Sequence, residues 1–418
     1  MMNRMRISRY VAVIIVSAFF LCAACGDSFA RIMKKDLTNE DLPDREGVKV
    51  GSLLVHSAAK VDEDLETNIF LANSDRKFDG ITILSPSVGF ELPLRENKIA
   101  VDYQADVYLY NTYNSENHVD HRIRAIGELN ATDYKFVVND TYNVMTSRAA
   151  NENSLRIRQY INDLRFGASA QFELLGVEVG YTNKLEAYGS QDTMVDQLTY
   201  EDKDRFNNII DATVSYRCMP KTLLLLENDI GFIHYYNSSE PPDSYFDETL
   251  IGIRGEWFHR SNVNFRAGFR YQDYDTSDVF SDKPFIGPVL RGGFDYRPTD
   301  RDTVLVDAER ANYESTYSTM NYYTANMIGA SYRHDFTDKI SSSLFGSYQL
   351  HMYPSETTEN GVTAKRYDSL YWAGASVRYD IRKWFSVEAK YQYNQKVSRF
   401  DTFSYYDNIA SIKGTVGF

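Results

Sequence analysis

The chain has 418 residues, of which 14% are aromatic and 32 are Tyr, and its mean hydropathy is −0.43. A helical membrane protein would be far more hydrophobic, whereas a membrane β-barrel averages to mild polarity because its strands alternate lipid-facing and lumen-facing residues; a soluble all-β protein also fits. The formal net charge of −13 argues against nucleic acid as a partner, since phosphate binding requires clustered Lys and Arg.

The first 30 residues have the three parts of an export signal. The basic start contains Arg4, Arg6 and Arg9, an apolar run follows at 11–24, and small residues precede the expected cleavage site near Ala30. The apolar run is too short for a membrane-spanning helix. We therefore predict a signal peptide over residues 1–30.

The three cysteines are Cys22, Cys25 and Cys218. The sequence Cys-Ala-Ala-Cys that ends at Cys25 weakly resembles a lipobox, so lipoprotein processing is the alternative to ordinary cleavage. After cleavage near Ala30 only Cys218 remains, and the mature protein then has no intramolecular disulfide. Residues 31–50 are mixed in charge and lack periodicity, so we expect a short periplasmic leader there.

From residue 51 to residue 418, apolar and polar residues alternate in one segment after another. A tilted strand needs roughly 9–11 residues of such alternation to cross a bilayer, and helical spacing would scatter the same residues around the axis. In the last segment one face carries Ala410, Ile412, Gly414, Val416 and Phe418. The sequence therefore predicts an all-β fold, a transmembrane antiparallel up-and-down β-barrel over residues 51–418.

About 18 strands are expected, with 16 as the alternative, because single-chain barrels have even strand numbers. Tight turns follow the even-numbered segments, and longer polar links such as 189–203 and 353–365 follow the odd-numbered ones. Outer-membrane barrels have short periplasmic turns and longer extracellular loops, so both termini are expected on the periplasmic side. The expected strands are 52–64, 79–93, 98–112, 118–130, 133–146, 155–172, 174–188, 204–218, 221–235, 245–258, 262–274, 285–297, 302–313, 320–335, 339–352, 366–380, 383–396 and 404–418.

Three residues mark particular points of the expected wall. Pro86 and Pro288 fall inside strands, where they cannot donate to the hydrogen-bond ladder, so we expect a local bulge at each or strands that begin later. Phe418 is expected to face outward and to be read by the barrel-assembly machinery. Its strand is expected to pair with the segment near Ser52, which leaves the sheet without a free edge.

Aromatic residues fall on both faces of the expected strands. On the lipid face, tyrosines near strand ends are expected to form interfacial girdles; these are Tyr103, Tyr181, Tyr216, Tyr271, Tyr296, Tyr332, Tyr379 and Tyr391. On the other face, five residues are candidates for stacking against sugar rings, although structural filling is favoured for them: Tyr108, Tyr188, Tyr274, Tyr323 and Trp372.

Charged residues of both signs fall on the face that is predicted to line the lumen. Charges are costly against lipid, so the lumen is expected to be water-filled or internally paired, with most charges in cross-strand pairs. A cylinder of about 18 strands is too wide for its own side chains to fill, and a channel remains unless a loop plugs it. The lumen-lining candidates are Asp102, Asp106, Arg122, Arg124, Arg165, Lys184, Arg254, Arg266, Arg270, Arg291, Trp372 and Arg378.

Catalytic signatures such as Gly-x-Ser-x-Gly, His-Glu-x-x-His and the Walker motif are absent from the sequence, and we expect neither enzyme activity nor a cofactor. His118 and His121 are the pair most suggestive of a metal. Residues three apart on a strand point to opposite faces, so ligation by this pair is not expected.

The start of the barrel carries a specific pattern of residues. It comprises Glu66-Thr67-Asn68-Ile69-Phe70, then Ser74-Asp75, then the strand 81–90 with its Ser85-Pro86-Ser87 core. This pattern resembles the opening of the putative β-barrel porin 2 family, with Thr67 in place of the usual Asp and Ser87 in place of the usual Gly. That family includes EpsL-like outer-membrane proteins encoded with exopolysaccharide or capsule systems. The resemblance implies passage of polysaccharide, or of solutes generally, across the outer membrane.

We therefore predict a passive channel in the outer membrane of a Gram-negative bacterium, with secreted polysaccharide as its cargo. A general diffusion porin for small solutes is the first alternative, and an outer-membrane enzyme or surface-binding barrel is the second. The expected partners are outer-membrane lipid, the barrel-assembly machinery and periplasmic polysaccharide-export proteins. The strands do not present a wholly apolar face of small residues that would mark a subunit contact.

Overall fold

The computed structural model describes residues 47–148, 152, 156–189, 199–237, 241–277, 280, 284–317 and 320–417. The predicted signal peptide, most of the predicted leader and Phe418 lie outside these residues. Within the described ranges, no helix is long and apolar enough to cross a membrane.

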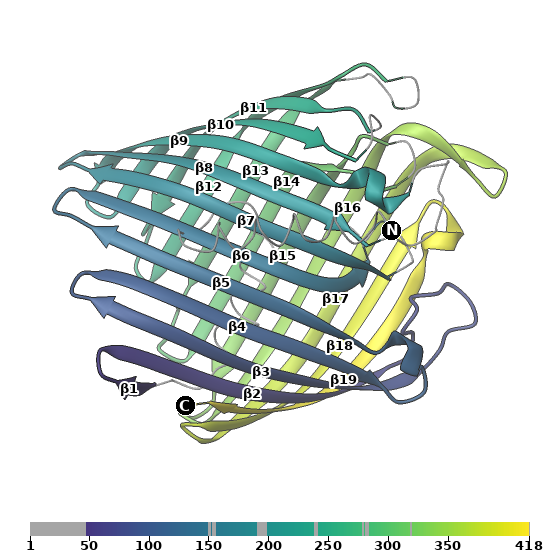
Figure 1. Ribbon diagram of the computed structural model, residues 1–418, viewed down its shortest axis with the longest axis horizontal. Helices are drawn as coiled ribbons and strands as arrows, with labels where there is room; N and C mark the ends of the chain where they lie inside the picture. The colour runs from purple at the N-terminus through teal and green to yellow at the C-terminus, as the bar shows by residue number, and fades with distance from the viewer. Residues whose placement is uncertain are drawn as a thin grey trace, which may run out of the picture.

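Eighteen antiparallel strands, β2 to β19, form one closed barrel (Figure 1). Each strand pairs with its neighbour in sequence, and β19 pairs with β2 from Gly417↔Ala58 to Ile409↔Glu66, which closes the sheet. The predicted fold class is confirmed, with 18 strands rather than 16. Their bounds are β2 Leu53–Glu66, β3 Asp79–Leu94, β4 Asn97–Tyr110, β5 His118–Asn130, β6 Tyr134–Arg148, β7 Arg156–Gln171, β8 Leu175–Tyr188, β9 Arg205–Met219, β10 Thr222–Tyr235, β11 Ser244–Gly255, β12 Ser261–Tyr274, β13 Phe285–Tyr296, β14 Asp302–Glu314, β15 Tyr322–Asp335, β16 Ile340–Glu359, β17 Val362–Arg382, β18 Phe385–Ser398 and β19 Tyr405–Gly417.

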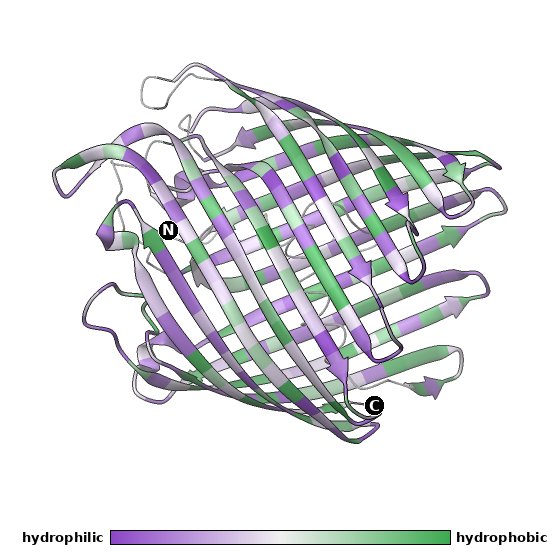
Figure 2. Cartoon of the chain, turned by 180° about the vertical axis from the view of Figure 1, so that it is seen from behind, coloured by the Kyte–Doolittle hydropathy of each residue, from purple (hydrophilic) through white to green (hydrophobic). Residues whose placement is uncertain are grey.

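The wall is built from the alternation that the sequence shows (Figure 2). Large apolar side chains on the outer face are exposed, for example Ile251, Phe269 and Ile412, each at least 65% exposed. An exposed apolar belt of this kind is stable only against lipid, because in water it would be a very large uncovered patch.

The two ends of the barrel differ in the length of their connections. Short turns such as 95–96 and 220–221 lie at one end, and longer links such as 67–78 and 111–117 lie at the other. The end of β19 lies at the short-turn end, where β1 (Val48–Val50) also pairs with the start of β2 (Figure 1). β1 falls within the segment that the sequence assigns to a leader, and it continues the edge of β2 beyond its pairing with β19.

One predicted polar loop is instead a projecting hairpin. Strands β16 and β17 extend through residues 353–365, which were expected to be a long loop, and they meet at Asn360 and Gly361 (Figure 1). Both turn residues have positive φ, 50° and 78°, and an Asn-Gly pair favours such a tight hairpin turn. The prediction of a loop was wrong because the residues on both sides of the Asn-Gly turn are polar and do not show the alternation of a strand.

The two prolines do not produce bulges. Around Pro86 the register of β3 with β4 is the same on both sides, from Leu84↔Val107 to Ser87↔Gln104, and pairing is only interrupted. Pro288 pairs with Phe269 without a register shift. Both expected explanations were wrong, since β3 and β13 also begin at the predicted positions. Each strand tolerates its proline by leaving a stretch without ladder bonds on one side.

Candidate functional site: a lumen crossed at the long-loop end

Strand register places all twelve lumen-lining candidates on one face of the sheet, but it does not bring them into one site. Four of them lie on β4 and β5, where Arg124 donates to Asp102 over 3.2 Å and Arg122 donates to Asn143 over 3.1 Å. Most of the others line a central cavity of about 870 Å³: Arg165, Lys184, Arg254, Arg266, Arg270, Arg291 and Trp372. Arg378 lines a separate cavity at the short-turn end.

Ion pairs cover one wall of the central cavity. Arg266 on β12 lies 2.9 Å from Glu227 on β10, and Arg291 on β13 lies 2.6 Å from Glu248 on β11. Each arginine therefore reaches a carboxylate two strands away rather than on the adjacent strand. The Glu248 side chain is wholly buried, so this wall is internally neutralised.

A third pair of this kind depends on a glycine of the intervening strand. Arg165 on β7 binds Asp211 on β9 through two hydrogen bonds, one of 2.7 Å, and Gly180 on β8 lies between them. A Cβ on Gly180 would lie 2.5 Å from the Arg165 guanidinium and 2.6 Å from Asp211. Because Gly180 has no side chain, the space above β8 is free for Arg165 to reach Asp211.

The β14–β15 hairpin leaves the wall at the long-loop end. β13 pairs with β14 only from Leu290 to Tyr296, whereas β14 stays paired with β15 up to Glu314↔Tyr322. Arg310, at the point of separation, donates to the Pro288 carbonyl over 3.2 Å. A seam therefore opens between β13 and β14 above Leu290.

The separated tip lies inside the barrel. By strand register, Glu314 belongs to the outer face of β14. It nevertheless accepts hydrogen bonds from Gln272 on β12 over 2.7 Å and from Tyr235 on β10 over 3.0 Å, and both of these residues lie on the inner face of the wall. Tyr322, opposite Glu314, stacks on the inner-face Tyr274 with 5.8 Å between ring centroids. The outer face of the β14–β15 tip thus covers the inner face of the β10–β13 wall.

The other side of the tip is bound to the far wall. Ser315 and Thr316 donate to both carboxylate oxygens of Glu152, from the link between β6 and β7, over 2.6 to 2.9 Å. Arg366 on β17 donates to the Glu152 carbonyl over 2.7 Å and lies against the ring of Tyr317. These contacts join β6–β7, β14–β15 and β17 and form a bridge of described residues across the lumen at the long-loop mouth, which we call the closure.

Aromatic packing completes this closure. One buried cluster contains Tyr317, Met320, Tyr323, Ala325 and Tyr353, and another contains Ile157, Tyr188 and Tyr200. Four of the five sugar-stacking candidates are thereby placed against other rings: Tyr188 on Tyr200, Tyr274 on Tyr322, Tyr323 on Tyr353 and Tyr108 on His118. Trp372 lies below the closure and stacks on Phe345. Like Tyr108 it is half-buried, whereas the other three candidates are buried.

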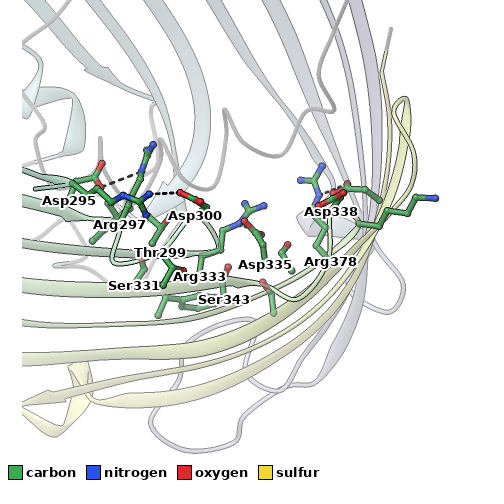
Figure 3. A pocket seen from close by; sticks show the side chains of 18 of the residues that line it. Asp295, Arg297, Thr299, Asp300, Ser331, Arg333, Asp335, Asp338, Ser343 and Arg378 are labelled. Carbon is green, nitrogen blue, oxygen red and sulfur yellow. Dashed lines mark hydrogen bonds and ion pairs between the residues drawn. The ribbon is translucent and has the colours of Figure 1, made fainter.

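The short-turn end contains a cavity of about 1590 Å³, which we call the vestibule (Figure 3). Its rim carries ion pairs between turn residues, such as Arg260 with Asp300 at 2.8 Å. Deeper in the wall, hydroxyl groups of Ser331, Ser343 and Ser376 alternate with charged groups. Trp372 lines both the vestibule and the central cavity, so it marks the junction between them.

Two adjacent ionisable residues are buried in the link before β9. Burial raises the pKa of Asp204 to about 7, although Tyr188 donates its backbone N–H to the carboxylate over 2.7 Å. Burial lowers the pKa of Lys203 to about 8, against the nearby Glu152 carboxylate, which raises it. Charge is therefore costly at this point of the closure.

Two of these residues have no signal in the sequence. Glu152 and Glu314 lie in or next to loops, where a charged residue is normally solvated, and strand alternation gives no reason to place them in the lumen. Arg366 has the same parity as Trp372 and Arg378 on β17, so alternation does place it on the inner face. His118 and His121 point to opposite faces: His118 stacks on Tyr108, and the His121 ring bonds the Tyr103 hydroxyl at 2.9 Å. Among the described residues, no group of three or more His, Cys, Asp or Glu could hold a metal ion.

Comparison with known proteins gives one family and several similar folds. A family model described as putative beta-barrel porin 2 matches residues 43–417. The OpdK structure from Pseudomonas aeruginosa with vanillate is 9% identical, with 87% of this chain and 99% of that chain covered and a TM-score of 0.46. OccAB3 of Acinetobacter baumannii is 9% identical, with 88% of this chain and 100% of that chain covered and a TM-score of 0.47. The DcaP outer membrane channel of the same species is 14% identical, with 89% of this chain and 99% of that chain covered and a TM-score of 0.44. No curated protein matches the sequence.

Proposed function

The chain belongs to the putative beta-barrel porin 2 family and is an outer-membrane β-barrel channel, and we propose that it is a conduit that exports a polysaccharide of the exopolysaccharide or capsule type. The proposal extends to an EpsL-like role, in which periplasmic export proteins deliver the polymer to the short-turn end.

The observation that carries the proposal is the difference between the two mouths. The vestibule is wide and opens where the short turns lie, which is the periplasmic side in barrels of this kind. The opposite mouth is crossed by the β14–β15 tip, which the contacts of Glu152 and Glu314 hold in the lumen. A conduit that admits cargo from the periplasm and opens outward only during export needs this asymmetry.

The lining supports a polar, uncharged or weakly charged polymer as cargo. Charges of both signs are paired along the wall, so neither ion sign is strongly selected. Serine hydroxyls and paired charges offer donors and acceptors at short intervals, which suits a chain of hydroxyl groups. A permanently open diffusion porin fits less well, because the β14–β15 tip narrows the long-loop mouth for every solute.

Gene deletion tests the proposal most directly. We expect the deletion strain to lose polysaccharide from its surface and to regain it when the full chain is supplied in trans. In planar bilayers, the purified barrel should show low conductance with rare openings. An unchanged surface polysaccharide, together with a steady large conductance, would instead establish the diffusion porin.

A further inference from the structure

We propose that Trp372 and Phe345 form a stacking site for a pyranose ring at the inner end of the vestibule. The site rests on the proposed export function for the polymer that would occupy it, and its chemistry defines the ligand class as a hexose-containing chain. Nothing in the closure described above uses either ring.

The two rings form one surface on the lumen wall. Phe345 is on β16 and Trp372 is on β17, and register places both on the inner face, since Phe345 pairs with Gly374 and Ser347 with Trp372. Their ring centroids are 4.8 Å apart and their planes differ by 26°, which is an offset stack. Both side chains are half-buried, so part of this aromatic surface faces the cavity.

A glycine allows Phe345 to lie close against the wall. A Cβ on Gly374 would lie 2.4 Å from the Phe345 Cε2 atom, a separation that real Cβ atoms do not show. The Phe345 ring therefore occupies the space that a side chain at residue 374 would take. The absence of a side chain at Gly374 therefore lets the Phe345 ring pack against β17.

The groups around the rings match the edge of a sugar. Ser343, Ser376 and Arg378 line the same cavity, and the Lys390 ammonium group lies 5.6 Å from the Phe345 ring centroid. A pyranose has one C–H face, which packs on an aromatic ring, and a rim of hydroxyls, which needs donors and acceptors. An aromatic surface with polar groups around it provides both, as ligand sites generally do.

The position of the site suits a moving polymer. Trp372 lines both the vestibule and the central cavity, so a chain that passes from one to the other must pass this ring. The four other aromatic candidates are packed against rings or a histidine. Trp372 is also stacked on a ring, that of Phe345, but it is half-buried and lines both cavities, so part of its surface remains available to a ligand.

Tryptophan fluorescence tests the site on the purified full-length barrel. The chain has three Trp residues, and the other two, Trp257 and Trp384, lie in turns and are 64% and 46% exposed. Replacing both by Phe leaves Trp372 as the reporter. Titration with maltohexaose, and with an oligogalacturonate as the acidic probe, should give a saturable change in emission, whereas polyethylene glycol of similar size should not.

Variants then assign the binding to the ring. Bilayer conductance blocked by the same oligosaccharides should require roughly three- to tenfold higher concentrations after Trp372→Ala, and should change little after Trp372→Phe, because the aromatic face remains. Tyr379→Ala, on the outer face of the same strand, is the matched control. Heat-modifiable mobility in SDS gels shows whether each variant has folded.

The results separate this site from the function on which it rests. Saturable binding at Trp372 that the Ala variant weakens supports the site, even if deletion leaves surface polysaccharide unchanged and the export function fails. Emission that none of the oligosaccharides alters overturns the site, even if deletion abolishes surface polysaccharide. Equal losses from Trp372→Ala and Tyr379→Ala would also overturn it.

Discussion

Gln272 donates a hydrogen bond of 2.7 Å to the Glu314 carboxylate, although Gln272 belongs to the inner face of the barrel wall and Glu314 to the outer face of its own strand. Such a bond requires the sheet to overlap itself. The β14–β15 tip provides the inner layer of that overlap, and the seam above Leu290 is where the layer separates from β13. The closure is therefore part of the wall itself.

Glu314→Ala should open the long-loop mouth. Tyr235, Gln272 and Tyr274 all donate to this carboxylate, and a buried donor left without an acceptor costs about 1–3 kcal/mol. The tip should then leave the lumen more often, and single-channel recordings should show more frequent or larger openings. Asp300→Ala, in a turn at the other end, is the control. Equal open probability in the two variants would contradict the closure.

Glu152 should hold the same tip from the far wall. Ala at this position removes three hydrogen bonds from Ser315 and Thr316, whereas Gln keeps one acceptor oxygen. We expect cells with Glu152→Ala to admit a large antibiotic such as vancomycin more readily than wild-type cells, and cells with Glu152→Gln to be intermediate.

A double variant tests whether the two carboxylates act on one element. Because Glu152 and Glu314 restrain opposite sides of the tip, the combined effect of the two Ala substitutions on open probability should depart from additivity. Purely additive effects would show that the two contacts restrain different segments.

The barrel could be predicted from the sequence because its signal is repeated. Alternation predicts which residues face lipid, and loop length predicts which end of the barrel faces the periplasm. These two features together gave all eighteen barrel strands. The projecting hairpin was missed although Asn360-Gly361 is a strong turn signal, because its flanking residues are polar on both faces.

The closure could not be predicted, because alternation assigns a residue to a face only if the strand stays in the wall. Asn312 and Glu314 follow the outer-face pattern and still bond inner-face residues, because their strand has moved inward. The one available sign was Pro288, whose missing N–H removes a ladder bond where the seam begins. For the ion pairs, parity placed Arg165 on the inner face, but its partner two strands away depends on Gly180.

Gly180→Ala should weaken the barrel. The added Cβ would meet the Arg165 guanidinium at 2.5 Å and displace it from Asp211, and separating a largely buried ion pair costs up to about 3–5 kcal/mol. We expect the folded form to be lost at a lower temperature when samples in SDS are heated before electrophoresis. Gly414→Ala is the matched control, since a Cβ there has no atom within 4 Å. An equal change in both variants would show that displacement of Arg165 from Asp211 is not the cause.

The link before β9, which contains the buried Asp204, should become less stable as the pH rises from about 4 to about 7. The pKa of Asp204 is raised by burial to about 7 from the ordinary value of 3.8. Between these two pH values the carboxyl group keeps its proton when the link is folded and releases it when the link unfolds. The stability of the link therefore falls as pH rises from about 4 to about 7 and levels off above that. Lys203 does not offset this change, because its pKa of about 8 confines its own contribution, which rises with pH, to higher pH. Hydrogen exchange of residues 199–205, corrected for the intrinsic rate, should show less protection at pH 7.5 than at pH 5. Asp204→Asn keeps a neutral side chain that still accepts the bond from Tyr188, so its protection should not change with pH over this range. A variant that loses protection with pH as the wild type does would assign the effect to another group.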